Sequence, residues 1–240
     1  MVRGKKIESI SIVDQVCVAI KDMIIHTPYH PGDRLPSEQE IAETYGVNKL
    51  SVRMALQKLS TLGVIEKRNG EGSFVKEFSI SPLLIEIADF IDSDEQMSDI
   101  QELRQLLEGD SAAKAAANAT EEEKAQLRAL VREYNSRMEI LLSSYSQETL
   151  LEMIRADSAF HRKIVSMSRN RLYIDIYTLV SRLVEKHISR LLIARKDALK
   201  SIARNQDIHN MLCDAICAGD GRKAREIACR IVDSQEIIEI

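Results

Sequence analysis

The chain has 240 residues, of which 45% are hydrophobic and 29% charged, and its formal net charge is −4. These proportions are ordinary for a soluble globular protein, and the length predicts two domains. The sequence has no run of eighteen apolar residues, and residues 1–10 lack the apolar core of a signal peptide. We therefore expect a cytoplasmic protein with no membrane partner.

The first predicted elements are two helices. A helix over residues 11–25 follows from apolar residues repeated at helical spacing. Ser37 and Glu40 form an N-terminal capping box for a second helix over residues 38–45. Gly46 ends that helix, because glycine readily adopts the left-handed backbone conformation that follows many helices.

A third helix and a β-hairpin come next. Asn48 caps a helix over residues 49–60, in which apolar residues again recur at helical spacing. Strand-like runs over residues 64–67 and 73–76 flank the turn-rich segment 68–72. This order of helix, turn, helix and two-stranded wing predicts a winged helix-turn-helix, and the helix over 49–60 is the one built to lie in a DNA major groove.

The rest of the chain predicts an all-α bundle. We expect a hinge over residues 78–96 that contains a short helix. Helices follow near residues 97–117, 121–144, 147–168, 170–196, 198–218 and 221–237. The predicted fold is therefore mostly α, with a winged helix-turn-helix domain of three helices plus a β-wing over residues 1–77. An antiparallel bundle of about six to seven helices follows over residues 97–240.

The winged segment contains three ordered motifs, PGDRLPSE (31–38), GVNKLSVRMALQKL (46–59) and GSFV (72–75). With these motifs it resembles the DNA-binding domain of the GntR family of bacterial transcription regulators. The family usually has Ser where this chain has Asn48, and often Pro where it has Ser51. The first change is mild, because Asn caps a helix as well as Ser does.

This resemblance implies a set of DNA-contacting residues. Arg53 is expected to read a guanine edge, and Arg34 to touch the DNA backbone or a base edge. Ser37, at a helix N-terminus, can support a phosphate through its backbone N–H, and two wing glycines allow a close approach to the minor groove. The predicted contacts are Arg34, Ser37, Lys49, Ser51, Arg53, Lys58, Arg68, Gly70 and Gly72. For each charged residue the alternative is a solvated surface side chain.

The charge of the winged half predicts modest DNA affinity for a single domain. Residues 1–77 hold eleven Lys and Arg against ten Asp and Glu, a net charge of about +1, and the remainder nets about −5. A DNA-binding domain often has a larger basic excess. We therefore expect a homodimer that reads a palindromic operator in double-stranded DNA, held together largely by the helical half.

The second half contains Arg104-x-x-x-Glu108, Asp157-x-x-x-His161 and His209 leading into MLCDAICAGD (211–220). In this order the patterns resemble the FadR-type ligand-binding domain (FCD), and this resemblance implies a metal site. Asp157 and His161 are four residues apart, so both project from one helix face and can grip one cation. His209 matches the third family ligand, whereas Ile231 stands where many members have a fourth. We expect Zn²⁺, Ni²⁺ or Mn²⁺ if a metal binds. The alternative is a hydrogen bond between Asp157 and His161, with His209 as a polar core residue.

Arg104 is the candidate effector anchor, because the family often points an Arg at this place into the cavity, where it can meet a carboxylate. An ion pair with Glu108, four residues on, is the alternative. The expected function is a DNA-binding transcription regulator, by default a repressor, controlled by a small organic acid. Two alternatives stay open: a dimeric DNA-binding protein without effector, and a metal-dependent enzyme, for which no hydrolase motif is present.

Cysteine usage adds a last expectation. Cys17, Cys213, Cys217 and Cys229 form no C-x-x-C pair, which argues against a zinc ribbon or a redox motif. Cys213 and Cys217 are one helical turn apart. They are either small apolar residues of a buried helix face, the interpretation we favour, or a redox pair.

Overall fold

The computed structural model describes residues 10–91, 95–194 and 206–236. Its contacts divide the chain into two compact units, residues 1–83 and 84–240, which are described separately below. Within the described ranges, no helix is both long enough and apolar enough to cross a membrane.

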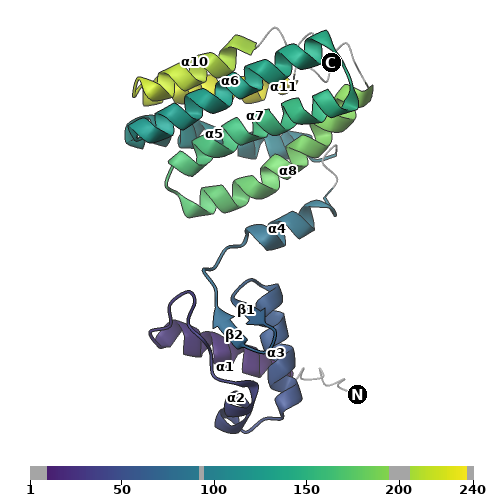
Figure 1. Ribbon diagram of the computed structural model, residues 1–240, viewed down its shortest axis with the longest axis vertical. Helices are drawn as coiled ribbons and strands as arrows, with labels where there is room; N and C mark the ends of the chain where they lie inside the picture. Colours follow the sequence, from purple (N-terminus) through teal and green to yellow (C-terminus); the bar gives the residue numbers. More distant parts are fainter. Residues whose placement is uncertain (1–9, 92–94, 195–205, 237–240) are drawn as a thin grey trace, which may run out of the picture. The chain divides into compact units, whose positions relative to one another are not determined.

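The first unit is a winged helix-turn-helix (Figure 1). Its elements are α1 (Ile12–His26), α2 (Glu38–Tyr45), α3 (Lys49–Thr61), β1 (Ile65–Arg68) and β2 (Gly72–Val75). The predicted caps are present: Ser37 and Glu40 form the capping box of α2, and Gly46 has a φ of 63° after it. The side chain of Asn48 accepts a hydrogen bond of 2.7 Å from the backbone N–H of Ser51 and starts α3.

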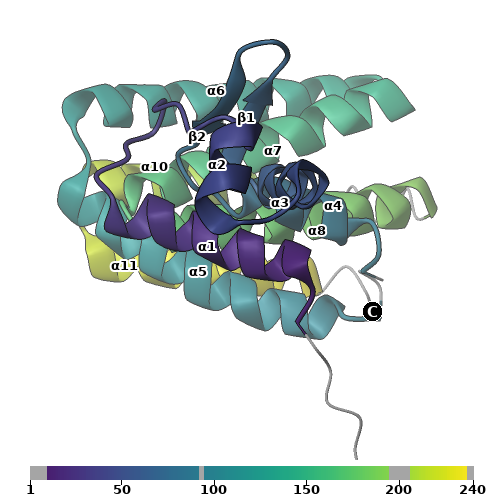
Figure 2. The ribbon, with the colours of Figure 1, turned by 90° about the horizontal axis from the view of Figure 1, so that it is seen from below.

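The core of this unit fixes which face of α3 is exposed. Val52, Leu56 and Leu59 of α3 are buried together with Ile20 of α1 and Ile65 of β1. In Figure 2 the helix α3 is seen almost along its axis, with α1 lying beside it. β1 and β2 pair antiparallel, from Ile65 opposite Val75 to Arg68 opposite Gly72. Because one side of α3 faces this core, the opposite side faces solvent.

The short hinge helix is present as α4, and the bundle helices lie within two residues of the predicted bounds wherever they are described. They are α4 (Ser81–Ala88), α5 (Met97–Asn118), α6 (Glu121–Ser143), α7 (Gln147–Met167), α8 (Arg171–Ala194), α10 (Gln206–Cys217) and α11 (Gly221–Glu236). For the helix predicted over 198–218, residues 198–205 lie outside the described ranges. Capping boxes at Thr120 and Ser146 start α6 and α7.

In the second unit, α5 is the central helix of the bundle. It packs against α7, α8, α10 and α11, while α6 packs against α7 and α10 (Figure 1). Small residues allow α5 and α11 to lie close together: a Cβ added at Gly109 would lie 2.9 Å from the Sγ of Cys229, and one at Gly221 would lie 3.1 Å from the carbonyl oxygen of Ala113. This packing brings polar side chains from α5, α7, α8 and α10 into one buried cluster, which is described below.

Candidate DNA-binding surface and buried polar cluster

Arg53 is the residue of the candidate DNA surface that was predicted to read a guanine edge. It is exposed on α3, and its Nε and Nη2 atoms donate to the Glu38 carboxylate at 3.0–3.3 Å. The Nζ of Lys67 lies 4.0 Å from the same carboxylate. The hydrogen bonds from Arg53 lower the pKa of Glu38. Glu38, at the N-terminus of α2, therefore forms ion pairs with Arg53 of α3 and with Lys67 of the wing.

Arg34 precedes α2 in the sequence, and its backbone pairs with strand β2 of the wing. The backbone N–H of Leu35 donates to the carbonyl of Ser73, and Arg34 forms a β-bridge with Phe74. A Cβ added at Gly72 would lie 3.1 Å from the Nε of Arg34, so the Arg34 side chain occupies the space beside that glycine. The predicted residues Arg34 and Gly72 are therefore neighbours.

The other predicted DNA residues differ in their surroundings. Gly70, at the wing tip, has a φ of 77° and open space around it. Arg68 lies over the Phe74 ring, with its guanidinium carbon 4.2 Å from the ring centroid. Lys49 and Ser37 are exposed. Lys58 lies near the C-terminal end of α3 and pairs with Asp14 of α1 at 2.6 Å.

Ser51 does not fit the predicted contact surface. Its side chain is only 8% exposed, because position 51 turns toward the side of α3 that packs into the core. We therefore leave Ser51 out of the DNA-contacting set.

Four exposed residues of α3 were absent from the prediction. Leu50 is 65% exposed and Met54 is 52% exposed, and Gln57 and Thr61 are exposed as well. The signal that identifies them is helical phase. Once Val52 and Leu56 are assigned to the core, positions 50, 54, 57 and 61 fall on the opposite face of the helix.

In the second unit, Asp157, His161 and His209 meet as the resemblance implies. The Oδ1 of Asp157 lies 3.1 Å from the Nε2 of His209 and 3.8 Å from the Nε2 of His161. The two Nε2 atoms are 3.3 Å apart. One ligand atom from each residue lies within 4.8 Å of the others. Two ring nitrogens and a carboxylate oxygen therefore converge from α7 and α10.

Glu108 is the buried residue that links this trio to α5 and α8. Its Oε2 lies 2.9 Å from the Nδ1 of His161, while its Oε1 accepts from the Nε of Arg104 at 2.7 Å and from the hydroxyl of Tyr177 at 3.3 Å. Burial by itself would raise the pKa of Glu108, but the cationic Arg104 and His161 outweigh it and lower that pKa to about 2. The carboxylate is therefore charged at neutral pH.

The donor set fits a divalent transition metal. Imidazole nitrogen plus carboxylate oxygen suits Zn²⁺, Ni²⁺ or Mn²⁺. The contact from Glu108 to the Nδ1 of His161 matches the carboxylate–histidine arrangement that orients metal-binding imidazoles. The Nδ1 of His209 is buried and has no hydrogen-bond partner in the described part of the chain. Ile231 is buried in the apolar core and offers no ligand atom.

Cys213 has the properties of a buried structural residue. Burial, with a smaller contribution from Cys217, raises the pKa of its thiol to about 12. A thiol with such a pKa has almost no thiolate at neutral pH and is therefore a poor nucleophile. This favours the interpretation of Cys213 and Cys217 as small apolar residues.

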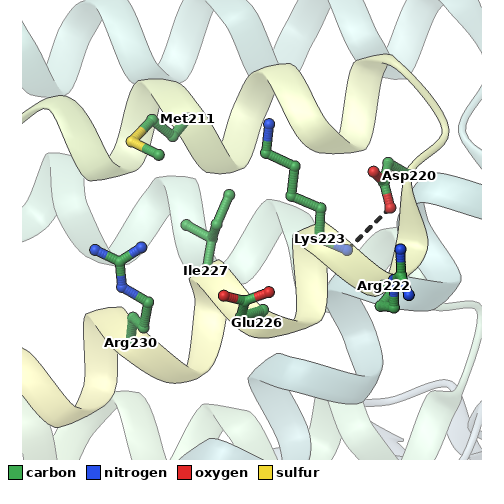
Figure 3. Close-up of a pocket in the computed structure, with 7 residues that line it drawn as sticks. All are labelled: Met211, Asp220, Arg222, Lys223, Glu226, Ile227 and Arg230. Carbon is green, nitrogen blue, oxygen red and sulfur yellow. Dashed lines mark hydrogen bonds between the residues drawn. The ribbon is translucent and has the colours of Figure 1, made fainter.

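A separate pocket lies between α10 and α11 (Figure 3). Its volume is about 400 Å³, and it is lined by the apolar Met211 and Ile227 and by charged residues that include Lys223 and Arg230. None of the residues predicted from the sequence as site residues lines it.

Comparison with known proteins identifies both halves. Residues 12–75 match the gntR family of bacterial regulatory proteins, and residues 99–234 match the FCD domain. The chain belongs to the GntR family of transcription regulators. This confirms the resemblance stated from the sequence, including the FadR-type second domain. Because GntR proteins are regulators and not enzymes, the enzyme alternative is removed.

Two relatives illustrate the membership. The HTH-type transcriptional regulator LutR of Bacillus subtilis (strain 168) is 30% identical over 207 residues, which cover 84% of this GntR chain and 89% of LutR. The Uxu operon transcriptional regulator of Escherichia coli (strain K12) is 31% identical over 163 residues, which cover 68% of this chain and 61% of that protein.

The fold is also found in a solved GntR structure. Streptococcus agalactiae GntR superposes with a TM-score of 0.64 at 21% identity, over 95% of this chain and 100% of that one. At this identity the likeness supports the shared fold alone.

The buried ion pair gives a prediction for stability. Replacing Arg104 by Met leaves the charged Glu108 buried with one cation fewer, and we expect the free energy of unfolding to fall by about 3–5 kcal/mol. The double variant R104M/E108L should regain part of this loss, because no buried carboxylate is left unpaired. Urea unfolding followed by circular dichroism measures both.

The matched control is Arg137→Met. Arg137 pairs with Glu133 and Glu152 on the partly exposed surface of α6 and α7, so its loss should cost only about 0–1 kcal/mol. Equal costs for R104M and R137M would show that burial of the Arg104–Glu108 pair has no energetic consequence.

Proposed function

We propose that this chain is a cytoplasmic repressor that binds a palindromic operator as a homodimer and is released by a small organic acid. Residues 1–77 would bind DNA, residues 78–96 would form the linker, and residues 97–240 would bind the effector and the partner subunit. The observation that carries the proposal is the exposed face of α3, with Arg53 held at the N-terminus of α2.

For DNA binding, α3 is the proposed major-groove helix. Arg53 can donate two hydrogen bonds to guanine N7 and O6. Lys49 lies one turn earlier on the same side of α3, within reach of a base edge or a phosphate. Arg34, Arg68 and the open wing tip at Gly70 would approach the adjacent minor groove. Lys58 is the least suited of these residues, since it lies near the C-terminal end of α3, away from the N-terminal residues that reach base edges.

An Arg53→Ala variant tests this surface. A duplex enriched from a random pool by the wild-type protein serves as the operator. Loss of a bidentate guanine contact should weaken operator binding by about 1–3 kcal/mol, measured by fluorescence anisotropy. Preference over a scrambled duplex should fall in parallel.

The control for Arg53→Ala is Arg132→Ala, which removes one exposed cation from α6. It should leave the preference intact. If both variants weaken operator and scrambled DNA alike, Arg53 contributes only charge and does not read sequence.

For effector binding, we propose that Asp157, His161 and His209 hold one divalent transition metal. Bound there, the ion would supply a Lewis-acidic site for the carboxylate of the effector. Glu108 would keep the His161 ring oriented, and Ile231 leaves the coordination to three protein ligands, as in sites that keep a position open. Arg104 is the proposed anion anchor, a role in which the effector would share its guanidinium with Glu108.

Metal content measured by elemental mass spectrometry tests the ligand set. We expect close to one equivalent of Zn, Ni or Mn per wild-type chain and a nearly metal-free His161→Ala variant, because two ligands hold a metal poorly. His187→Ala is the control, since His187 on α8 lies outside the trio, and it should keep its metal. A wild-type protein that stays empty when offered all three ions would overturn the metal proposal.

For dimerisation, we propose a surface on α5 and α8, two helices that pack together. Leu106 of α5 is 60% exposed and Leu172 of α8 is 68% exposed, and Leu103 adds a third exposed apolar side chain. Large exposed apolar side chains on two packed helices favour a surface that a partner covers. Effector binding would then change the spacing of the two winged units, for which a coupling of about 1–3 kcal/mol is enough.

Leu106→Glu tests the dimer surface. A charge placed in an apolar interface costs several-fold in affinity, so the variant should shift from dimer to monomer in sedimentation velocity at micromolar concentration. Leu142→Glu, on an exposed position near the end of α6, is the control and should remain dimeric. A wild-type monomer, or a Leu106→Glu variant that stays dimeric, would contradict the proposed surface.

A further inference from the structure

The exposed face of α3 has an apolar centre. Leu50 and Met54 are four residues apart, so their side chains are neighbours on the helix surface. A single exposed leucine needs no explanation. Here the two apolar side chains lie directly opposite the buried Val52, Leu56 and Leu59, which places them at the middle of the solvent face.

Charged residues flank this apolar pair on both sides. Lys49 and Arg53, also four residues apart, lie along one edge of the exposed face, and Lys58 lies beyond the other edge. A helix that enters the major groove uses its outer cations at the phosphates and base edges and points the middle of its face at the groove floor. Leu50 is the second residue of α3, and the N-terminal residues of such helices are the ones that reach base edges.

The groove floor offers one apolar group among the four standard bases. Each base presents hydrogen-bond donors or acceptors there, and only thymine adds a C5-methyl group. A leucine side chain cannot satisfy a donor or an acceptor, so a polar base edge opposite Leu50 would lose its hydrogen bonds to water without replacement. A thymine methyl instead gains from burial against it.

We propose that Leu50 reads a thymine C5-methyl group in each operator half-site, with Met54 extending the apolar contact. The inference rests on the proposed placement of α3 in the major groove and adds a specificity determinant to it. Arg53 and Leu50 are three residues apart on one face, so a guanine contact and a thymine contact would lie close together in each half-site.

Uracil substitution tests the inference at the level of one methyl group. Each thymine of the wild-type-enriched duplex is replaced singly by uracil, which removes the methyl group and leaves every hydrogen-bonding atom in place. At one thymine per half-site, we expect wild-type affinity to fall about fourfold, as for a single buried methyl group. Leu50→Ala should bind the thymine and uracil duplexes equally well at that position.

Two variants serve as controls. Ile25→Ala, on α1, removes a side chain of similar exposure (70%) outside the recognition helix and should keep the full uracil penalty. Arg53→Ala should lose preference for the enriched duplex but keep the difference between thymine and uracil. Because Leu50 is exposed, its replacement leaves the core of the winged unit intact, and thermal unfolding checks this.

The outcomes distinguish a failure of the thymine contact of Leu50 from a failure of the proposed DNA surface. Uracil penalties that are equal in the wild type and Leu50→Ala, or absent at every position in the wild type, would overturn the role of Leu50 alone. A wild-type protein that enriches no sequence from the pool would overturn the proposed DNA surface, and the role of Leu50 with it.

Discussion

The second unit depends on the Glu108 carboxylate. Partners from three helices meet at its two oxygens. Arg104 of α5 itself and Tyr177 of α8 donate hydrogen bonds to Oε1, and His161 of α7 forms an ion pair with Oε2. Burying a carboxylate is costly unless cations and hydrogen bonds compensate it, so the positions of these helices are tied to the position of one side chain. The same carboxylate contacts both Arg104, the proposed effector anchor, and His161, one of the proposed metal ligands.

The winged unit is organised in the opposite way, from an apolar core outward. Val52, Leu56 and Leu59 fix the rotation of α3, and that rotation decides which of its side chains face solvent. Glu38 then positions two exposed cations, because it forms ion pairs with Arg53 of α3 and Lys67 of β1. Packing therefore decides which side chains of α3 are exposed, and ion pairs then position one of them, Arg53.

The sequence predicted the helices well because their ends have local causes. Capping by Ser37, Asn48 and Thr120 is decided by neighbours three residues away, and the helix bounds follow. The placement of Asp157 and His161 on one face also follows from spacing. The contact between Glu108 and His161 joins residues 53 positions apart on different helices, and no local pattern encodes it. The burial of Ser51 and the exposure of Leu50 follow from the helical phase of α3 once Val52 and Leu56 are assigned to the core, so the sequence carried a signal for both.

The missing Cβ of Gly72 gives the wing a sequence constraint of its own. Its φ of 119° already favours glycine, and the Arg34 side chain lies in the volume that any other side chain would enter. Any side chain at position 72 would therefore displace the guanidinium of Arg34, which is 38 residues away in the sequence. In related chains, positions 34 and 72 should therefore change together or both stay the same. Replacing the wing glycine should have the same effect as removing the arginine.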